Sequence, residues 1–183
     1  MLKKQTVGAV VREIAESYPT TEAYVYPEHN IRKTYEQFDQ ETDHLAKAFM
    51  GMGIAKGDHV AIWSDNKREW LLSQFATGKM GAVLVTVNTN YQEKELDYLL
   101  NQSDATTLIL GEEFKGTSYI DVLNAVCPEV KTSEKGDIQS EHLPFFKRVI
   151  VMSENEYPGI YTWGEFEAHA SKITDEELDE RVS

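Results

Sequence analysis

Cysteine and long apolar runs are the scarcest features of this sequence. A single cysteine, Cys127, among 183 residues excludes an internal disulfide and any metal site built from several cysteines. No run of 18 apolar residues occurs, which argues against a membrane span. The first residues, Met1 to Thr6, contain no apolar segment of signal-peptide length. Together these absences predict a cytoplasmic protein in a reducing compartment.

Basic residues are also few. The sequence has 18 Lys and Arg against 31 Asp and Glu, a formal charge of −13. Nucleic acid is therefore not expected as a partner, because neutralising phosphates requires clustered Lys and Arg. Apolar residues make up 41% and aromatic residues 10%, which is too much for a disordered acidic tail. The length suits one domain, or one and a fraction.

Familiar catalytic motifs are missing. We find no phosphate loop with a Gly-Lys-Ser/Thr end, no Gly-x-Ser-x-Gly elbow, no His-Glu-x-x-His and no Cys-x-x-Cys. The five histidines never stand three or four residues apart, so no metal site is predicted. Cys127 has no basic neighbour to lower its pKa, and we expect it to be buried and structural. The residues alone assign no catalytic group.

The first quarter of the chain predicts a helix, a hairpin and a longer helix. Apolar residues at helical spacing favour a helix over residues 6–18, and Pro19 ends it. Two β-prone runs, 23–26 and 31–34, flank turn-forming residues and predict a hairpin. Thr34 with Gln37 forms a capping box for a helix that ends at Gly51 or Gly53.

From residue 60 onward, short apolar runs alternate with helical segments. The predicted strands are 60–63, 82–87, 106–110 and 148–152. The predicted helices are one capped by Asn66, then 92–100 and 119–126. This alternation predicts an α/β fold, a mostly parallel sheet with helices on both faces, preceded by a helix and a small hairpin. The strand Ala82–Val87 is the most apolar, so we expect it to be central.

Two segments fall outside the alternation. Residues 131–143 are polar and predict a surface loop. Residues 174–183 carry a Thr174-x-x-Glu177 capping box and predict a short solvated acidic helix. We therefore divide the chain into an α/β subdomain over 1–172 and an acidic helical tail or linker over 173–183. Because no closing strand follows, the sequence suggests a truncated domain.

Ligands of open parallel sheets bind at the carboxyl ends of the strands. Two such ends are polar here: Trp63-Ser64-Asp65-Asn66, and the run Asn88, Thr89, Asn90 and Tyr91. The latter precedes a helix, whose N-terminal backbone N–H groups suit an anion. Glu93 and Glu95 weaken this interpretation, because acidic side chains can occupy that end themselves. Plain turn and capping chemistry explains both segments equally well.

Four blocks of sequence, in order, resemble the N-terminal region of AMP-forming acyl-CoA synthetases, which belong to the adenylate-forming superfamily. They are Thr34-Tyr35-Glu36-Gln37 with Met52 to Ile62, then Asn66 to Trp70, then Lys79 to Tyr91, and Glu95-Leu96-Asp97-Tyr98. The segment Val122 to Val130, followed by Leu143-Pro144, is most similar to the medium-chain fatty acid-CoA ligase branch. The resemblance extends over roughly Val7 to Trp163.

The resemblance implies an enzyme that joins a fatty acid to CoA using ATP and Mg²⁺, through an acyl-AMP intermediate. It also implies a cofactor-binding role for Asn88, Thr89, Asn90 and Tyr91, beside the entrance for CoA. The family's Ser/Thr/Gly-rich loop ending in Pro-Lys-Gly does not occur in this sequence, and neither do the family's later ribose-binding acidic residue and its adenylation lysine.

We therefore expect the chain to be an N-terminal fragment that is inactive alone and holds no cofactor tightly. It would self-associate through the surface that a second subdomain covers in the family. The alternatives are a free-standing module that binds a nucleotide or acyl-CoA without chemistry, and an interaction subunit that completes a partner's sheet.

Overall fold

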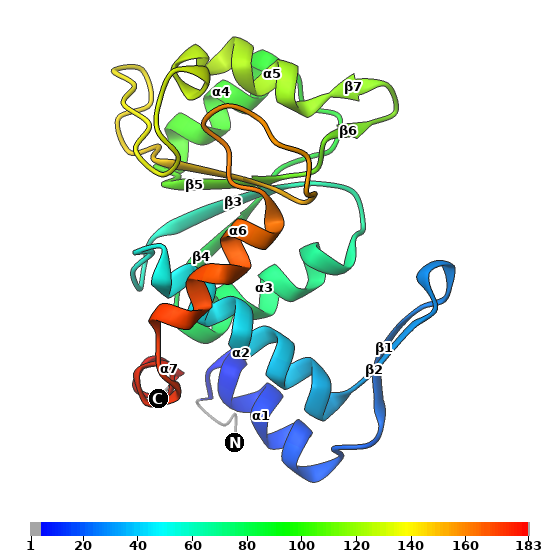
Figure 1. Cartoon of the computed structure of the whole chain (residues 1–183). Helices are drawn as coiled ribbons and strands as arrows, with labels where there is room; N and C mark the ends of the chain where they lie inside the picture. The colour runs from blue at the N-terminus through cyan, green and yellow to red at the C-terminus, as the bar shows by residue number, and fades with distance from the viewer. Residues whose placement is uncertain (1–4, 183) are drawn as a thin grey trace.

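The computed structural model describes residues 5–182 and shows a parallel sheet between two layers of helices (Figure 1). The sheet has four strands: β3 (His59–Trp63), β4 (Val83–Thr86), β5 (Thr107–Leu110) and β8 (Arg148–Val151). Their order is β4-β3-β5-β8, and every pair is parallel. The predicted α/β fold class is confirmed. Residues 1–4 and 183 lie outside the described residues. The predicted start of the α/β subdomain at residue 1 and the predicted end of the acidic tail at residue 183 therefore lie outside them too.

Helices cover both faces of this sheet (Figure 1). One layer contains α4 (Glu93–Gln102) and α5 (Tyr119–Val126). The other contains α1 (Val7–Ser17), α2 (Tyr35–Gly51), α3 (Arg68–Met80), α6 (Trp163–Ala168) and α7 (Asp175–Val182). Side chains alternate along each strand, so Ile62 joins the core under α2 and α3 while Trp63 joins the core under α4 and α5. Each inner strand is thus buried on both faces, as its continuous apolar sequence requires.

The most apolar run does not form a central strand, so that prediction is wrong. β4 lies at the edge of the sheet, and Val83 is 44% exposed. The central strands are β3 and β5; every residue of β5 is buried, and so is β3 from Val60 onward. An apolar sequence indicates that helices cover both faces of a strand, but it does not indicate whether both of its edges are paired with other strands. The run 82–87 is partly covered on its faces and is paired along one edge in the described part of the chain.

The hairpin projects from the helical layer as an arm (Figure 1). It consists of β1 (Glu22–Tyr26) and β2 (Ile31–Thr34), joined by the 3₁₀ turn η1 (Pro27–His29). Asn30 takes the left-handed conformation at φ 52°, which Asn tolerates better than most residues. The predicted capping box is present: Thr34 accepts from the Gln37 amide at 3.3 Å, and Gln37 accepts from the Thr34 amide at 3.1 Å.

Two other local predictions need correction. Asn66 does not cap α3, because the helix begins at Arg68 and Lys67 stands at its N-cap without a side-chain hydrogen bond. The C-terminal helix is not solvated all round. Its capping box forms, with Glu177 accepting from the Thr174 amide at 2.8 Å, but Leu178 and Val182 are buried against the helical layer.

The sequence prediction also omitted several short elements. They are the hairpin β6 (Glu113–Phe114) with β7 (Thr117–Ser118), helix α6, and the 3₁₀ turns η2 (Pro128–Lys131) and η3 (His169–Lys172). Residues 131–143 run mostly as a loop, as predicted, with Ile138 buried as an anchor.

Candidate functional site at the carboxyl edge of the sheet

The two polar strand ends lie together in the structure. The indole N–H of Trp63, at the end of β3, donates to the carbonyl oxygen of Asn88 at 3.0 Å. A backbone hydrogen bond joins the same two strand ends, because the Val87 amide donates to the carbonyl of Ile62 at 2.9 Å. The loop after β4 is thus fixed to the neighbouring strand at its first residue.

The predicted loop, Asn88 to Tyr91, is a tight turn. The side-chain oxygen of Asn88 accepts from the Asn90 amide at 2.9 Å, and the Asn88 carbonyl accepts from the Tyr91 amide at 3.1 Å. An Asn that binds the backbone two residues ahead is a common turn device. Asn88 and Asn90 are exposed, whereas Thr89 and Tyr91 are half-buried.

A residue that sequence reasoning missed completes the anchor. Tyr119, at the start of α5, stacks on Trp63 with ring centroids 3.8 Å apart and planes at 19°. Its hydroxyl donates to the carbonyl of Thr89 at 2.8 Å. Burial raises the pKa of Tyr119 to about 12, with the Asp65 carboxylate adding to the shift, so the hydroxyl stays protonated as a donor. No motif marks Tyr119 in the sequence, because its role depends on packing between distant segments.

The amides that immediately precede α4 have partners within the chain. The Gln92 amide donates to the Glu95 carboxylate at 3.2 Å, and Glu93 adds a second acid to the first turn. The amides of residues 90, 91 and 92 therefore all have partners within the chain. A ligand at this loop would therefore meet the exposed side chains of Asn88 and Asn90 rather than these three amides. Whether the four residues bind a cofactor stays a prediction.

The segments that follow β3 and β5 place one basic and one acidic group at the same edge of the sheet. Ser64 is buried and donates to the Asp65 carbonyl at 2.9 Å. The Lys67 ammonium lies over Gly111, 3.8 Å from where a Cβ of that residue would stand. The Glu112 carboxylate accepts from the Tyr157 hydroxyl and from the side-chain amide (Nδ2) of Asn155, both at 2.6 Å. These hydrogen bonds lower the pKa of Glu112 and keep it ionised.

Cys127 behaves as predicted. It is fully buried, and burial raises the pKa of its thiol to about 11, with the Glu129 carboxylate contributing. A thiol in that state is a poor nucleophile at neutral pH. Across residues 5–182, no three His, Cys, Asp or Glu side chains gather as metal ligands would. None of the helices in that range combines the length and apolar character needed to cross a bilayer.

Comparison with known proteins defines the class. A model of the family described as AMP-binding enzyme matches residues 11–173. YngI of Bacillus subtilis (strain 168), described as an acyl-CoA synthetase, is 51% identical over 178 residues, which are 97% of this chain and 32% of YngI. The mitochondrial medium-chain acyl-CoA ligase ACSF2 of Danio rerio is 36% identical over 160 residues, 87% of this chain and 26% of that protein.

Solved structures agree on the fold. A long-chain-fatty-acid CoA ligase from Rhodopseudomonas palustris superposes with a TM-score of 0.71 at 22% identity, covering 88% of this chain and 36% of that one. The anthranilate CoA ligase AuaEII, solved with anthranoyl-AMP, gives a TM-score of 0.74 at 19% identity over 92% of this chain and 29% of its own.

The chain therefore shares the α/β fold of these ligase structures. By the extent of the family match, this chain belongs to the AMP-binding enzyme family. It spans about a third or less of the length of these curated relatives.

Proposed function

We propose that this chain forms the N-terminal part of a fatty acid-CoA ligase, whose whole reaction converts a fatty acid, ATP and CoA into acyl-CoA, AMP and pyrophosphate. The observation that carries the proposal is the 51% identity to YngI over nearly the whole chain. The similarity to ACSF2, named a medium-chain ligase, supports a medium-chain fatty acid as the substrate. ATP, Mg²⁺ and CoA would serve the whole enzyme.

Within that enzyme, we propose that the loop Asn88 to Tyr91 borders the path of CoA. Trp63 and Tyr119 donate hydrogen bonds to the backbone carbonyls of the loop, whereas the side chains of Asn88 and Asn90 are exposed to solvent. Lys67 and Glu112 follow β3 and β5 at the same edge of the sheet, and they place one positive and one negative charge there. The loop would guide the ligand without taking part in bond making.

A chimera tests the proposed reaction. The 178 residues of this chain that match YngI replace the corresponding part of YngI, and decanoyl-CoA formation is measured with ATP, Mg²⁺, CoA and decanoic acid. We expect activity within about tenfold of YngI, because the exchanged segments are 51% identical. A folded chimera that makes no acyl-CoA with fatty acids from acetate to palmitate would refute the proposal.

The 183-residue chain should not form acyl-AMP by itself. Catalysis of adenylation depends on groups that position the ATP phosphates and stabilise the charge that develops in the transition state. The sequence holds no Ser/Thr/Gly-rich loop ending in Pro-Lys-Gly to do this. We expect pyrophosphate release from ATP, Mg²⁺ and decanoic acid to equal a blank without protein. Release above that blank, abolished when the fatty acid is omitted, would contradict this prediction.

A further inference from the structure

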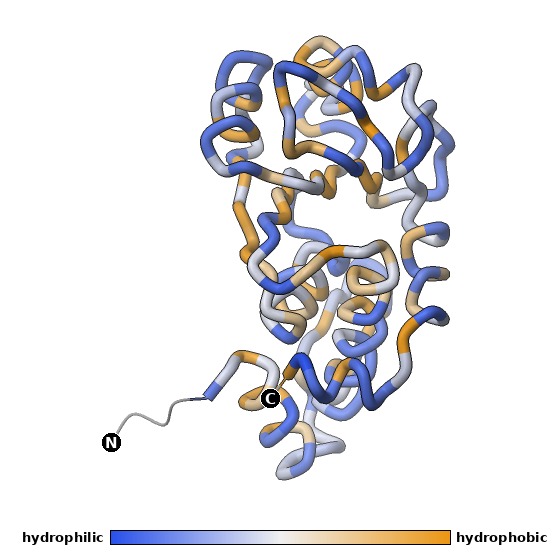
Figure 2. Tube along the Cα trace, turned by 90° about the vertical axis from the view of Figure 1, so that its left-hand side faces the viewer, coloured by the Kyte–Doolittle hydropathy of each residue, from blue (hydrophilic) through white to orange (hydrophobic). Residues whose placement is uncertain are grey.

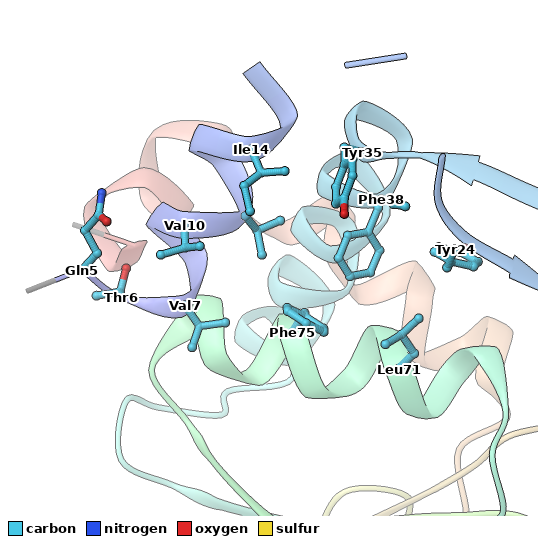
Figure 3. Close-up of a pocket in the computed structure, with 12 residues that line it drawn as sticks. Gln5, Thr6, Val7, Val10, Ile14, Tyr24, Tyr35, Phe38, Leu71 and Phe75 are labelled. Carbon is cyan, nitrogen blue, oxygen red and sulfur yellow. The ribbon is translucent and has the colours of Figure 1, made fainter. Parts of the chain in front are cut away.

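An apolar cavity lies between the first helix and the hairpin, apart from the carboxyl edge of the sheet. Its volume is about 450 Å³. α1 contributes Val10 and Ile14, α2 contributes Phe38, and α3 contributes Leu71 and Phe75 (Figure 3). In the hydropathy view, this region of the chain is a mixture of apolar and polar segments (Figure 2). Pockets of about 300–1,000 Å³ with apolar walls are typical of small-molecule sites.

The far wall of the cavity is firmly packed. Phe38 makes edge-to-face contacts with Tyr24 on one side, at 5.7 Å between centroids, and with Phe75 on the other, at 5.0 Å. The Tyr24 hydroxyl is already bonded, because it donates to Glu41 and accepts from Arg68. The aromatic side chains are thus held in place before any ligand arrives.

The near wall leaves apolar surface in water. Val7 is 51% exposed and Val10 is 40% exposed, and both line the cavity. At the mouth, Gln5 donates to Glu13 at 2.8 Å, and the Thr6 hydroxyl donates to the Val182 carbonyl at 3.2 Å. A ligand that covered the two valines would bind more favourably because it would remove their apolar surface from water.

No described residue that lines the cavity is charged. A carboxylate or phosphate inside would therefore lose its hydration without gaining a cation, in a chain whose formal charge is already −13. A second copy of the chain is a poorer fit, since a stable interface needs about 800 Å² from each partner and this recess is sized for a small molecule.

We propose that this cavity binds an uncharged apolar small molecule, such as an alkyl chain with a neutral head group. The site is separate from the proposed CoA loop and would hold its ligand through apolar burial. A neutral alcohol should bind it better than a carboxylate with the same alkyl chain. That preference distinguishes the cavity from a site for a fatty acid substrate.

The test uses the 183-residue chain and N-phenyl-1-naphthylamine, a neutral probe that fluoresces in apolar surroundings. We expect saturable binding of one probe per chain, displaced by 1-decanol at a concentration at least tenfold lower than that of decanoate. The variant Val10→Trp, which fills the cavity, should weaken probe binding at least tenfold. Ala125→Trp, at an exposed position of α5 on the opposite layer, should leave it unchanged.

Each outcome decides the proposal. Circular dichroism and thermal melts first establish that both variants are folded. If Val10→Trp does not fold, the alcohol-against-carboxylate comparison in the unaltered chain decides alone. Absence of saturable binding, equal or better displacement by decanoate, or equal binding by folded Val10→Trp would overturn the proposal. So would a dimer in sedimentation that Val10→Trp abolishes, since the face would then be an interface between two copies.

Discussion

At the scale of single residues, Glu41 joins the arm to the helical layer. This α2 carboxylate is 17% exposed and pairs with Lys33 of β2 at 2.8 Å and with Arg68 of α3 at 2.9 Å. Tyr24 of β1 donates a third hydrogen bond to it. Burial alone would raise the pKa of Glu41, but the hydrogen bonds from Lys33, Tyr24 and Arg68 outweigh burial and hold it below the usual value.

We predict that Glu41→Gln lowers the free energy of unfolding by about 1–2 kcal/mol at pH 7, since the ion pairs with Lys33 and Arg68 are lost. A lowered folded-state pKa means that Glu41 stabilises the fold above its unfolded pKa of about 4.3. That stabilisation is lost as the pH falls through the lower folded-state value. Urea unfolding at a series of pH values should therefore show the variant and the parent converging in acid.

Glu22→Gln is the matched control, because Glu22 pairs with Arg32 on the exposed arm, with both side chains more than half exposed. Such surface pairs contribute about 0–1 kcal/mol. A Glu41→Gln deficit no larger than that of Glu22→Gln, or one that persists unchanged in acid, would show that the carboxylate does not hold the arm.

At the scale of elements, α7 belongs to the helical layer. Lys47 of α2 pairs with Asp175, and Arg12 of α1 pairs with Asp179 at 2.7 Å. Leu178 is 1% exposed and Val182 is 6% exposed. These two side chains, four positions apart, lie on one face of the helix and explain why the acidic segment packs although most of its residues are polar.

Leu178→Ala should lower the free energy of unfolding by about 2–4 kcal/mol, because the substitution removes buried methyl groups and leaves a cavity. Glu176→Ala, at an exposed position of the same helix, should change it by less than about 0.5 kcal/mol. Chemical denaturation measures both values. Equal, small effects would mean that α7 is only loosely attached in solution.

Periodicity and capping chemistry predicted most elements because those signals are local. Residue spacing and turn-forming residues predict four features that the structure contains: the helix at 7–17, the arm, the Thr34 cap and α5. The Thr162-x-x-Glu165 box could have revealed α6, since Thr162 accepts from the Glu165 amide at 3.2 Å. The order of the strands in the sheet could not be predicted from local sequence, because the edge position of β4 depends on which distant strands pair with it.

At the candidate site too, the local features could be predicted from the sequence and the long-range contacts could not. The sequence predicted the two polar strand ends, and the structure brings them together through Trp63 and Asn88. It could not predict Tyr119 or the Glu112–Tyr157 pair, which bring together residues 30 and 45 positions apart in the chain. The sequence also predicted that an acidic side chain could occupy the N-terminal end of α4. In the structure the Glu95 carboxylate accepts from the Gln92 amide at that end.

At the scale of the whole molecule, the sheet has an open edge. β4 pairs with β3 on one side only in the described part of the chain, and its sequence, Val-Leu-Val-Thr, contains no charged residue. Edge strands without charges or prolines tend to pair with another chain. We propose that any self-association of this chain uses that edge, with Val83 partly exposed on it.

Sedimentation velocity should then show reversible self-association that increases with salt, because salt screens the repulsion between chains of formal charge −13. Val83→Lys should shift the equilibrium toward monomer, whereas Tyr98→Lys, at an exposed apolar position of α4, should not. A monomer at all salt concentrations, or equal effects of the two substitutions, would refute this use of the edge.

The placement of the loop after β4 beside CoA is the central functional claim, and one kinetic comparison in the YngI chimera tests it. Asn88→Asp keeps the oxygen that accepts from the Asn90 amide, so the turn survives, but adds a negative charge at an exposed position. Asn30→Asp adds the same charge at the tip of the distant arm. We predict that Asn88→Asp raises the KM for CoA at least threefold while the KM for ATP changes less than twofold, and that Asn30→Asp changes neither. Equal changes in both KM values, or no change in either, would contradict the account and leave the loop with a structural role alone.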